Sequence, residues 1–284
     1  MTDVPEAFVL KEVGEHRYEA ASIGDPDQRD VVFGGQLLAQ MILASQATHP
    51  EKEVKSVHAI FARSGTLRQP VEIVVDPMHD GRTLGSDTVT IWQGDRLCAR
   101  GLLLLHVDEP DIIRHQPEMP EVAGPDESVD TGQGGLCSPG TELRVVDGVN
   151  TWDPDAPLGP AELFAWIRLP GGPGEYVLNQ AMLSYATDGF LIGTAMRPHE
   201  GIGQNMAHRG ISTGVVSHTL TFHERFDAGT WLLMAHESPY AGRGRSYGRC
   251  HVFTEDGRLV ASFVQENLIR ELGESAGGRP GAVM

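Results

Sequence analysis

An internal repeat is the feature that most constrains the fold of this chain. The order of one strand, one helix and four further strands occurs twice in the sequence. The helical segment LLAQMILASQAT at 37–48 aligns with VLNQAMLSYATD at 177–188. Farther along, VHAI aligns with SHTL, which pairs His58 with His218, and GDRLCARGLLL aligns with DGRLVASFVQE. Because the matches keep their order and a similar offset, the sequence predicts two copies of one structural unit.

Each copy has the pattern of a long helix lying against an antiparallel sheet. The turns QGDR and TEDGR separate the last two strand-like runs of each copy, which is typical of antiparallel hairpins. A helix wrapped by such a sheet is a hotdog unit, so the repeat predicts an α+β double hotdog. The predicted units are residues 1–108 and 159–273, and the second unit carries the candidate catalytic residues. Residues 109–158, rich in Pro, Gly, Asp and Glu, are predicted to be a surface connection, and 274–284 a flexible tail.

Charge and hydropathy exclude several classes of protein. The chain has 284 residues and a formal net charge of −17, from 22 basic and 39 acidic residues, which argues against nucleic-acid binding. No apolar run approaches the ~20 residues needed to cross a bilayer. The N-terminal sequence MTDVPEAFVLKEVGEH lacks the features of a signal peptide. We therefore expect no membrane insertion.

The cysteines and histidines predict neither a disulfide framework nor a metal site. Cys98, Cys137 and Cys250 are far apart and odd in number, which fits a reducing cytoplasm. His218 and His223 lie five residues apart on one predicted strand and face opposite ways, and the chain has no CxxC or HxxxH motif. We expect a cytoplasmic protein without a metal.

Two polar residues stand at apolar-patterned positions in the second copy alone. Asp188 lies on an apolar stripe of its predicted helix, where the first copy has Thr48. Gln265 interrupts an alternating apolar row of its strand, where the first copy has Leu103. A lone Asp near a helix end more often faces water, and a Gln can mark the end of a core. Because both are specific to the same copy, however, a functional role is the better interpretation, and a buried carboxylate must be neutral, paired or in use.

Further candidates lie near these two residues. The strand STGVVSHTLTFH places a row of hydroxyl groups, including Ser217, on one face; this row is either a donor beside Asp188 or the solvated side of the strand. Gly34 and Gly35 open the first helix, where free backbone N–H groups can polarise a carbonyl or hold an anion. Their alternative role is tight packing of the helix.

The segment GRGRSYGR contains a G-x-S-x-G match and a basic cluster. The match, Gly244–Gly248, is rejected as a hydrolase nucleophile elbow because a strand, not a helix, follows it. Arg243, Arg245 and Arg249 form a local basic cluster that can bind phosphate. Ordinary surface arginines are an equally good interpretation.

The segments FGGQLLAQ, SYATD, HTLTFHERF, TWLL, EDGRLVAS and VQENLIR, taken together and in this order, resemble the acyl-CoA thioesterase II family. The similarity covers nearly the whole chain outside the 108–158 connection and the tail. It implies an enzyme that hydrolyses acyl-CoA thioesters, with CoA as part of the substrate and no cofactor. We also expect a homodimer of double hotdogs.

The resemblance implies roles for individual residues. In that family a helix Asp, a strand Thr or Ser and a Gln of the last strand position a water molecule for thioester hydrolysis. Asp188 and Gln265 match directly, the first as the base that takes the proton of the water and the second as the amide that orients it. The hydroxyl position falls on Val215, which is a departure from the pattern. Thr213 and Ser217 lie two residues to either side, and Ser217 is our candidate for the third residue.

Two other functions stay open at this point. A hotdog hydratase would carry an Asp followed five residues later by a His, but Asp25 is followed by Asp30, and Asp188 has no His before His199. Hydration of crotonyl-CoA by the pure protein would favour this class. A non-catalytic acyl-CoA binder is made credible by Val215, and tight CoA-ester binding without thiol release would favour it.

Overall fold

The computed structural model describes residues 6–27, 29–132, 140–153, 155–169, 175–207 and 209–272. The predicted flexible tail at 274–284 lies outside these residues, as does Cys137. Cys98 and Cys250 are both buried and free of disulfide bonds. Among the described residues, no helix is long and apolar enough to cross a membrane.

The first half of the chain contains one long helix and six strands. The α1 helix is buried all round, because every residue from Gly35 to Ser45 is buried, which is typical of a helix enclosed by other elements. The elements of this half are η1 (Glu6–Phe8), β1 (Lys11–Gly14), β2 (Arg17–Ala20), α1 (Gly34–Thr48), β3 (Glu53–Phe61), β4 (Val71–Asp80), β5 (Leu84–Gln93) and β6 (Arg96–His106).

The second half repeats this succession and adds a short helix. The elements are β7 (Glu142–Val145), η3 (Val146–Gly148), β8 (Glu162–Arg168), α2 (Tyr176–Ala186), α3 (Leu191–Met196), η4 (Gln204–Met206), β9 (Ile211–Phe222), β10 (Leu232–Gly242), β11 (Arg245–Thr254) and β12 (Leu259–Glu271). The two predicted hairpins are present, between β5 and β6 and between β11 and β12. Each turn contains a glycine in the left-handed region, Gly94 (φ 60°) and Gly257 (φ 82°).

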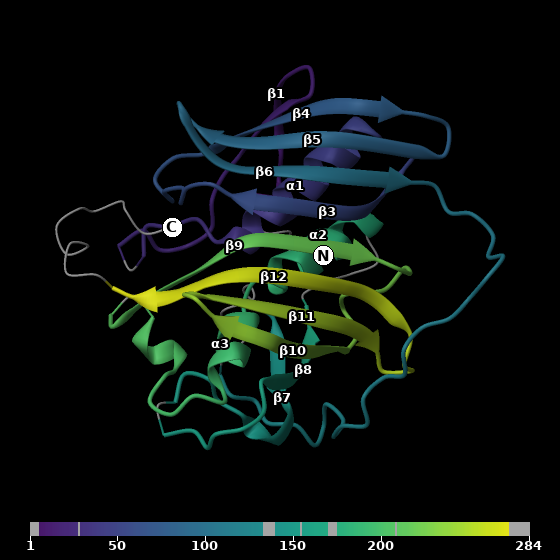
Figure 1. Ribbon diagram of the computed structural model, residues 1–284. Helices are drawn as coiled ribbons and strands as arrows, with labels where there is room; N and C mark the ends of the chain where they lie inside the picture. Colours follow the sequence, from purple (N-terminus) through teal and green to yellow (C-terminus); the bar gives the residue numbers. More distant parts are fainter. Residues whose placement is uncertain are drawn as a thin grey trace.

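All twelve strands form one sheet, in the order β1-β2-β4-β5-β6-β3-β9-β12-β11-β10-β8-β7. The order is that of two copies of one six-stranded arrangement that meet at β3 and β9, and these two strands pair antiparallel. Figure 1 shows the strands stacked in this order, with α1 and α2 together behind them. We call the side that faces these helices the inner face of the sheet. The predicted α+β double hotdog is confirmed.

The strand register corrects one match of the repeat. Val57 pairs with Leu103 in the first half, and His218 pairs with Gln265 in the second. Since Leu103 and Gln265 correspond in the repeat, His218 corresponds to Val57, and the predicted match with His58 is wrong by one residue. A shift of one residue moves a side chain to the other face of a strand. Accordingly His58 is exposed, whereas His218 is fully buried.

The two long helices pack side by side, as the repeat predicts. A Cβ atom at Gly35 would lie 2.2 Å from the carbonyl oxygen of Tyr185, so the start of α1 touches the backbone of α2. The ring of Phe33 lies 5.0 Å from that of Tyr185, and the ring of Phe8 lies 6.0 Å from it. No side chain larger than that of glycine fits at this crossing.

The second helix ends earlier than its apolar stripe predicts. The α2 helix stops at Ala186, and Asp188 lies in the turn between α2 and α3. The hydroxyl of Thr187 donates to the carbonyl of Ser184, a local bond that competes with helix continuation, and Gly189 follows. The carboxylate therefore sits just beyond the end of the helix rather than on its side.

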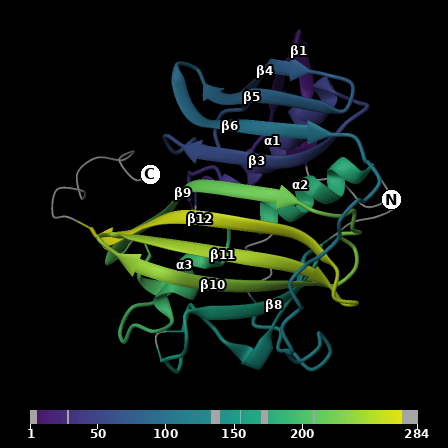
Figure 2. The ribbon, with the colours of Figure 1, turned by 45° about the vertical axis from the view of Figure 1, so that its right-hand side comes forward.

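The predicted connection at 109–158 covers the outer face of the second half. It leaves β6, runs toward β8 (Figure 2) and contributes β7, η3 and a bridge between Val129 and Val145. The indole N–H of Trp166 donates to the carbonyl of Ala123. Met119, Val122 and Ala123 pack against a small outer-face core. That core consists of Val146, Trp166, Trp231, Leu233, Phe253 and Leu259.

Candidate active site

The carboxylate of Asp188 lies against the first turn of α1, and its side chain is only 5% exposed. The backbone N–H of Gly35 donates to Oδ2 of Asp188 at 3.1 Å. A Cβ atom at Gly34 would lie 2.7 Å from the same oxygen. The predicted tight packing is therefore present at Gly35, and Gly34 leaves room for the carboxylate, while a role of the pair in substrate binding stays a prediction. The positive end of the α1 dipole stabilises the negative charge.

Gln265 extends from β12 toward the same carboxylate and is 1% exposed. Its Nε2 lies 3.1 Å from the backbone carbonyl of Thr187, 3.4 Å from Oδ1 of Asp188 and 2.9 Å from Nδ1 of His218. Its Oε1 is buried and has no hydrogen-bond partner among the described residues. The structure therefore brings Asp188 and Gln265 together across 77 positions of the chain and leaves one amide oxygen available.

His218 is a member of the site that the sequence reasoning missed. Its ring is fully buried, stacks on Phe263 at 5.4 Å, and places Nδ1 3.8 Å from Oδ1 of Asp188. Its Nε2 lies 3.1 Å from the hydroxyl of Thr187. The sequence contained a signal for it. His218 alternates with Leu220 on one face of the strand, and it lies on the same strand as the candidate Ser217. From the sequence, His218 was considered only as a possible metal ligand and as a repeat match.

Ser217, the predicted third residue, is not brought to the site. Its partners on the two neighbouring strands are Glu266 and Ile60, which are both exposed, so Ser217 belongs to the outer face. A β-bulge follows, and it places Val215 opposite the buried Asn267. The bulge therefore turns Val215 toward the inner side, and with it Thr213, which is buried and pairs with Ile269 two residues farther along β12.

The predicted phosphate-binding arginines lie on the outer face as well. Arg245 and Arg249 are exposed and alternate with Ser246 and Gly248, which are buried. The guanidinium group of Arg249 binds the carboxylate of Glu237 through Nε at 2.9 Å and Nη2 at 2.8 Å. The structure does not bring these arginines to the buried carboxylate.

A different arginine, Arg29, is within electrostatic range of Asp188. Desolvation lowers the pKa of Arg29, and the charge of Asp188 acts in the opposite direction. Arg29 belongs to the segment between β2 and α1. Arg243, the third member of the predicted basic cluster, lies in the β10–β11 turn with φ 57°.

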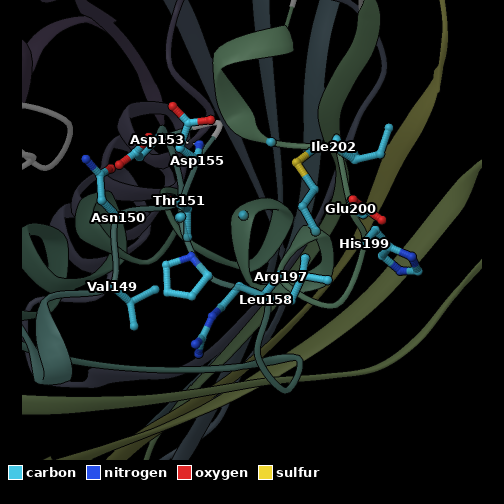
Figure 3. A pocket seen from close by; sticks show the side chains of 16 residues that line it. Val149, Asn150, Thr151, Asp153, Asp155, Leu158, Arg197, His199, Glu200 and Ile202 are labelled. Carbon is cyan, nitrogen blue, oxygen red and sulfur yellow. Dashed lines mark hydrogen bonds between the residues drawn. The ribbon is translucent and has the colours of Figure 1, made fainter.

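Two surface cavities lined by described residues lie elsewhere. One of about 340 Å³ is enclosed between Asn150 and Thr151 of the connecting segment and His199 and Ile202 of the loop after α3 (Figure 3). Another of about 400 Å³ lies between the start of β3 and the first turn of α2. Neither lining includes the carboxylate site. Among the described residues, no group of His, Cys, Asp and Glu side chains is arranged to hold a metal ion.

Comparison with known proteins adds to this geometry. Residues 24–106 match the acyl-CoA thioesterase N-terminal domain, and residues 115–269 match the acyl-CoA thioesterase C-terminal domain. Acyl-CoA thioesterase 2 of Haemophilus influenzae is 30% identical over 254 residues, which cover 84% of this chain and 87% of that protein. Human acyl-coenzyme A thioesterase 8 is 26% identical over 84% of this chain and 80% of its own length.

Solved structures agree over almost the entire chain. The acyl-CoA thioesterase II TesB2 of Mycobacterium marinum superposes with a TM-score of 0.79 and 26% identity, covering 95% of this chain and 99% of that one. A tesB protein of Mycobacterium avium subspecies paratuberculosis gives a TM-score of 0.78 and 27% identity, with coverage of 94% and 98%. With both halves of the domain pair matched in order, the chain belongs to the acyl-CoA thioesterase II family of double hotdogs.

Proposed function

We propose that this protein hydrolyses acyl-CoA to a free fatty acid and CoA by means of a water molecule that Asp188 and Gln265 position. The observation that carries this proposal is the buried carboxylate held between a helix N-terminus and an amide whose oxygen has no partner among the described residues. Hydrolysis of a thioester needs a base for the water and a donor for the developing oxyanion. The site offers both.

Asp188 is the proposed base. Its Oδ2 is occupied by the N–H of Gly35, and its Oδ1 faces Gln265 at the longer distance of 3.4 Å. Oδ1 is thus the oxygen that takes the proton of the attacking water. The carbonyl oxygen of Gln265 accepts the other hydrogen of that water, which aims the water lone pair away from the protein and toward the substrate.

The positive end of α1 is the proposed place for the thioester carbonyl. Developing negative charge on the carbonyl oxygen is stabilised there by the helix dipole and by backbone N–H groups of the first turn. Gly34 is the candidate donor, because the absence of a side chain leaves the helix terminus open beside the carboxylate.

Arg245 and Arg249 remain our candidates for the phosphates of CoA. In a chain with a net charge of −17, a local group of exposed cations is the natural contact for the phosphate groups of CoA. Arg249 is engaged by Glu237, so Arg245 is the stronger of the two candidates. A cytoplasmic location and a homodimer remain predictions; sedimentation of the pure protein tests the second.

Single-turnover hydrolysis in ¹⁸O-labelled water tests the mechanism. Direct attack by water puts ¹⁸O into the fatty acid on the first turnover. If the Asp188 carboxylate attacked instead, displacing CoA thiolate, and water then opened the resulting anhydride at the aspartyl carbonyl, the fatty acid would carry ¹⁶O from the protein on that turnover, which would contradict the assigned role. Thiol release over acyl-CoAs from short to long chains then defines the substrate. Crotonyl-CoA serves as the control for hydration, which we do not expect, because Asp25 lies in an exposed turn and position 30 is Asp rather than His.

A further inference from the structure

We propose that His218 is a positioning residue that, together with Thr187, fixes which end of the Gln265 amide faces the reacting water. This inference rests on the proposed mechanism. It assigns a purpose to a fully buried imidazole that contacts Gln265 and Thr187, and it explains why an inner-face position that is Val57 in the first half is a histidine in the second.

The direction of each hydrogen bond follows from its partners. The carbonyl oxygen of Thr187 and the carboxylate of Asp188 can only accept, so the atom of Gln265 that faces them is the NH₂ group. The same NH₂ lies 2.9 Å from Nδ1 of His218. Nδ1 must therefore be the acceptor, and the proton of a neutral His218 ring is on Nε2.

The other end of the ring completes a chain of bonds in one direction. Nε2–H of His218 donates to the hydroxyl of Thr187 at 3.1 Å. That hydroxyl donates in turn to the carbonyl of Ser184 at 2.7 Å. Stacking on Phe263, with 23° between the two planes, holds the imidazole in the required orientation. Every donor in this series of hydrogen bonds has an acceptor. The carbonyl of Ser184 in α2 therefore fixes the tautomer of His218, and the tautomer fixes the orientation of the Gln265 amide.

Two consequences follow for the water. Rotation of the amide by 180° would set Oε1 against three acceptors, so Oε1 is held on the opposite side, where it has no partner among the described residues. In addition, the NH₂ group has two hydrogens, and the shorter contacts direct them to His218 and to the carbonyl of Thr187. Oδ1 of Asp188, at 3.4 Å, has only a long contact with the amide, so this oxygen can accept a hydrogen bond from the water.

Three substitutions at one position separate this role from simple packing. His218→Phe keeps a ring against Phe263 but removes both nitrogens. We expect kcat to fall about 3–20-fold with little change in KM, which is the effect of losing the one hydrogen bond that orients Gln265. His218→Asn places an oxygen near the position of Nδ1 and should recover most of kcat. His218→Gln places its polar group near Nε2 and should resemble His218→Phe. Equal kcat values for the Asn and Gln variants would overturn the proposal.

A double-mutant cycle tests whether His218 acts through Gln265. In a Gln265→Ala background, His218→Phe should cause no further loss of kcat, because the group that it orients is gone. Full additivity would contradict the inference. His236→Phe is the matched control: His236 is also buried and lies 5.9 Å from Phe263, but no hydrogen bond joins it to Gln265 among the described residues, and its kcat should stay at the wild-type value.

The tautomer can be measured in the unmodified protein. ¹⁵N NMR of histidine-labelled protein should show one buried ring with a protonated Nε2 and a bare Nδ1, assigned to His218 by its loss in His218→Asn. A protonated Nδ1 would overturn the proposal whether or not the Phe variant folds. A wild-type rate of thioester hydrolysis in Asp188→Asn would contradict the proposed function itself. An inactive Asp188→Asn together with a fully active His218→Phe would contradict this inference alone.

Discussion

On the inner face of the sheet, three neighbouring strands of each half place one residue each side by side in a row. The buried polar residues stand at different positions of this row in the two halves. In the first half Asp87, Leu103 and Val57 lie side by side on β5, β6 and β3. Asp87 is fully buried and binds the hydroxyl of Ser45 and Nε2 of His49, the latter at 2.8 Å. Both partners come from α1 and its C-cap, so the sheet carboxylate is closed off by the helix that covers it.

In the second half the same row reads Gly248, Gln265 and His218. The glycine is required because a Cβ atom there would lie 2.7 Å from the side chain of Leu191 in α3. In this half the buried acid is Asp188, which lies in the turn after α2 and not on the sheet. The sheet contributes the amide of Gln265. A closed polar network stabilises a fold, whereas one with an unpartnered acceptor can receive a ligand. The difference shows how one scaffold holds a closed polar network in one half and, in the other, a buried carboxylate beside an amide oxygen that has no partner among the described residues.

The largest contrast is expected between Asp188 and its counterpart Thr48. Asp188→Asn keeps the shape of the side chain but removes the base, so kcat should fall ~10²–10⁴-fold. Thr48→Val removes only a hydroxyl that bonds to the carbonyl of Ala44 and should leave kcat within about twofold. Thiol release at saturating acyl-CoA measures both. If the two variants lose activity equally, the catalytic distinction between the halves is wrong.

The reverse contrast concerns stability. Asp87→Ala leaves Ser45 and His49 without their buried partner, so the free energy of unfolding should fall by about 3–5 kcal/mol. The variant that remains folded should keep its kcat, because Asp87 lies in the other half. Urea unfolding followed by circular dichroism, with Asp188→Asn as the control, gives the comparison. A loss of kcat in the folded Asp87→Ala protein would show that the first half takes part in catalysis.

Acid should act on the second half through His236, whose counterpart is the apolar Val75. Burial lowers the pKa of His236 from 6.5 to about 4. Between these values the unfolded chain binds a proton that the folded chain does not, so stability falls as pH decreases from about 6.5 to 4. The full loss is about 3 kcal/mol. His236→Phe should flatten this part of the curve of unfolding free energy against pH, and an unchanged slope would contradict the assignment.

The smallest effect is expected from the exposed arginine of the second half. Arg245→Ala should raise KM about two- to fivefold and leave kcat unchanged, since a solvated charge contributes little and binds ground state and transition state alike. Arg17→Ala, which removes an exposed arginine of the first half, is the control and should leave KM unchanged. The effect of Arg245 should fade with added salt. An unaltered KM would identify it as ordinary surface charge.

The sequence by itself determined the architecture and the two central residues. Repetition of helical and alternating patterns at a near-constant offset is a property of the whole chain, so the double hotdog followed without any contact being known. Asp188 and Gln265 were identified because each breaks an apolar pattern that the other copy keeps. Both were predicted to serve one site, and the structure places the amide nitrogen of Gln265 3.4 Å from the carboxylate.

Only the tertiary structure decided which neighbouring side chains join them. Whether Val215 and Thr213 share the face of Ser217 or that of His218 depends on a one-residue bulge in β9, because a one-residue shift exchanges the faces of a strand. The break after Ala186 and the approach of Gly35 to Asp188 arise where segments 153 positions apart meet. Local patterns report which residues are apolar, but they do not report which distant backbone will supply a partner, because that is set by how the two halves pack.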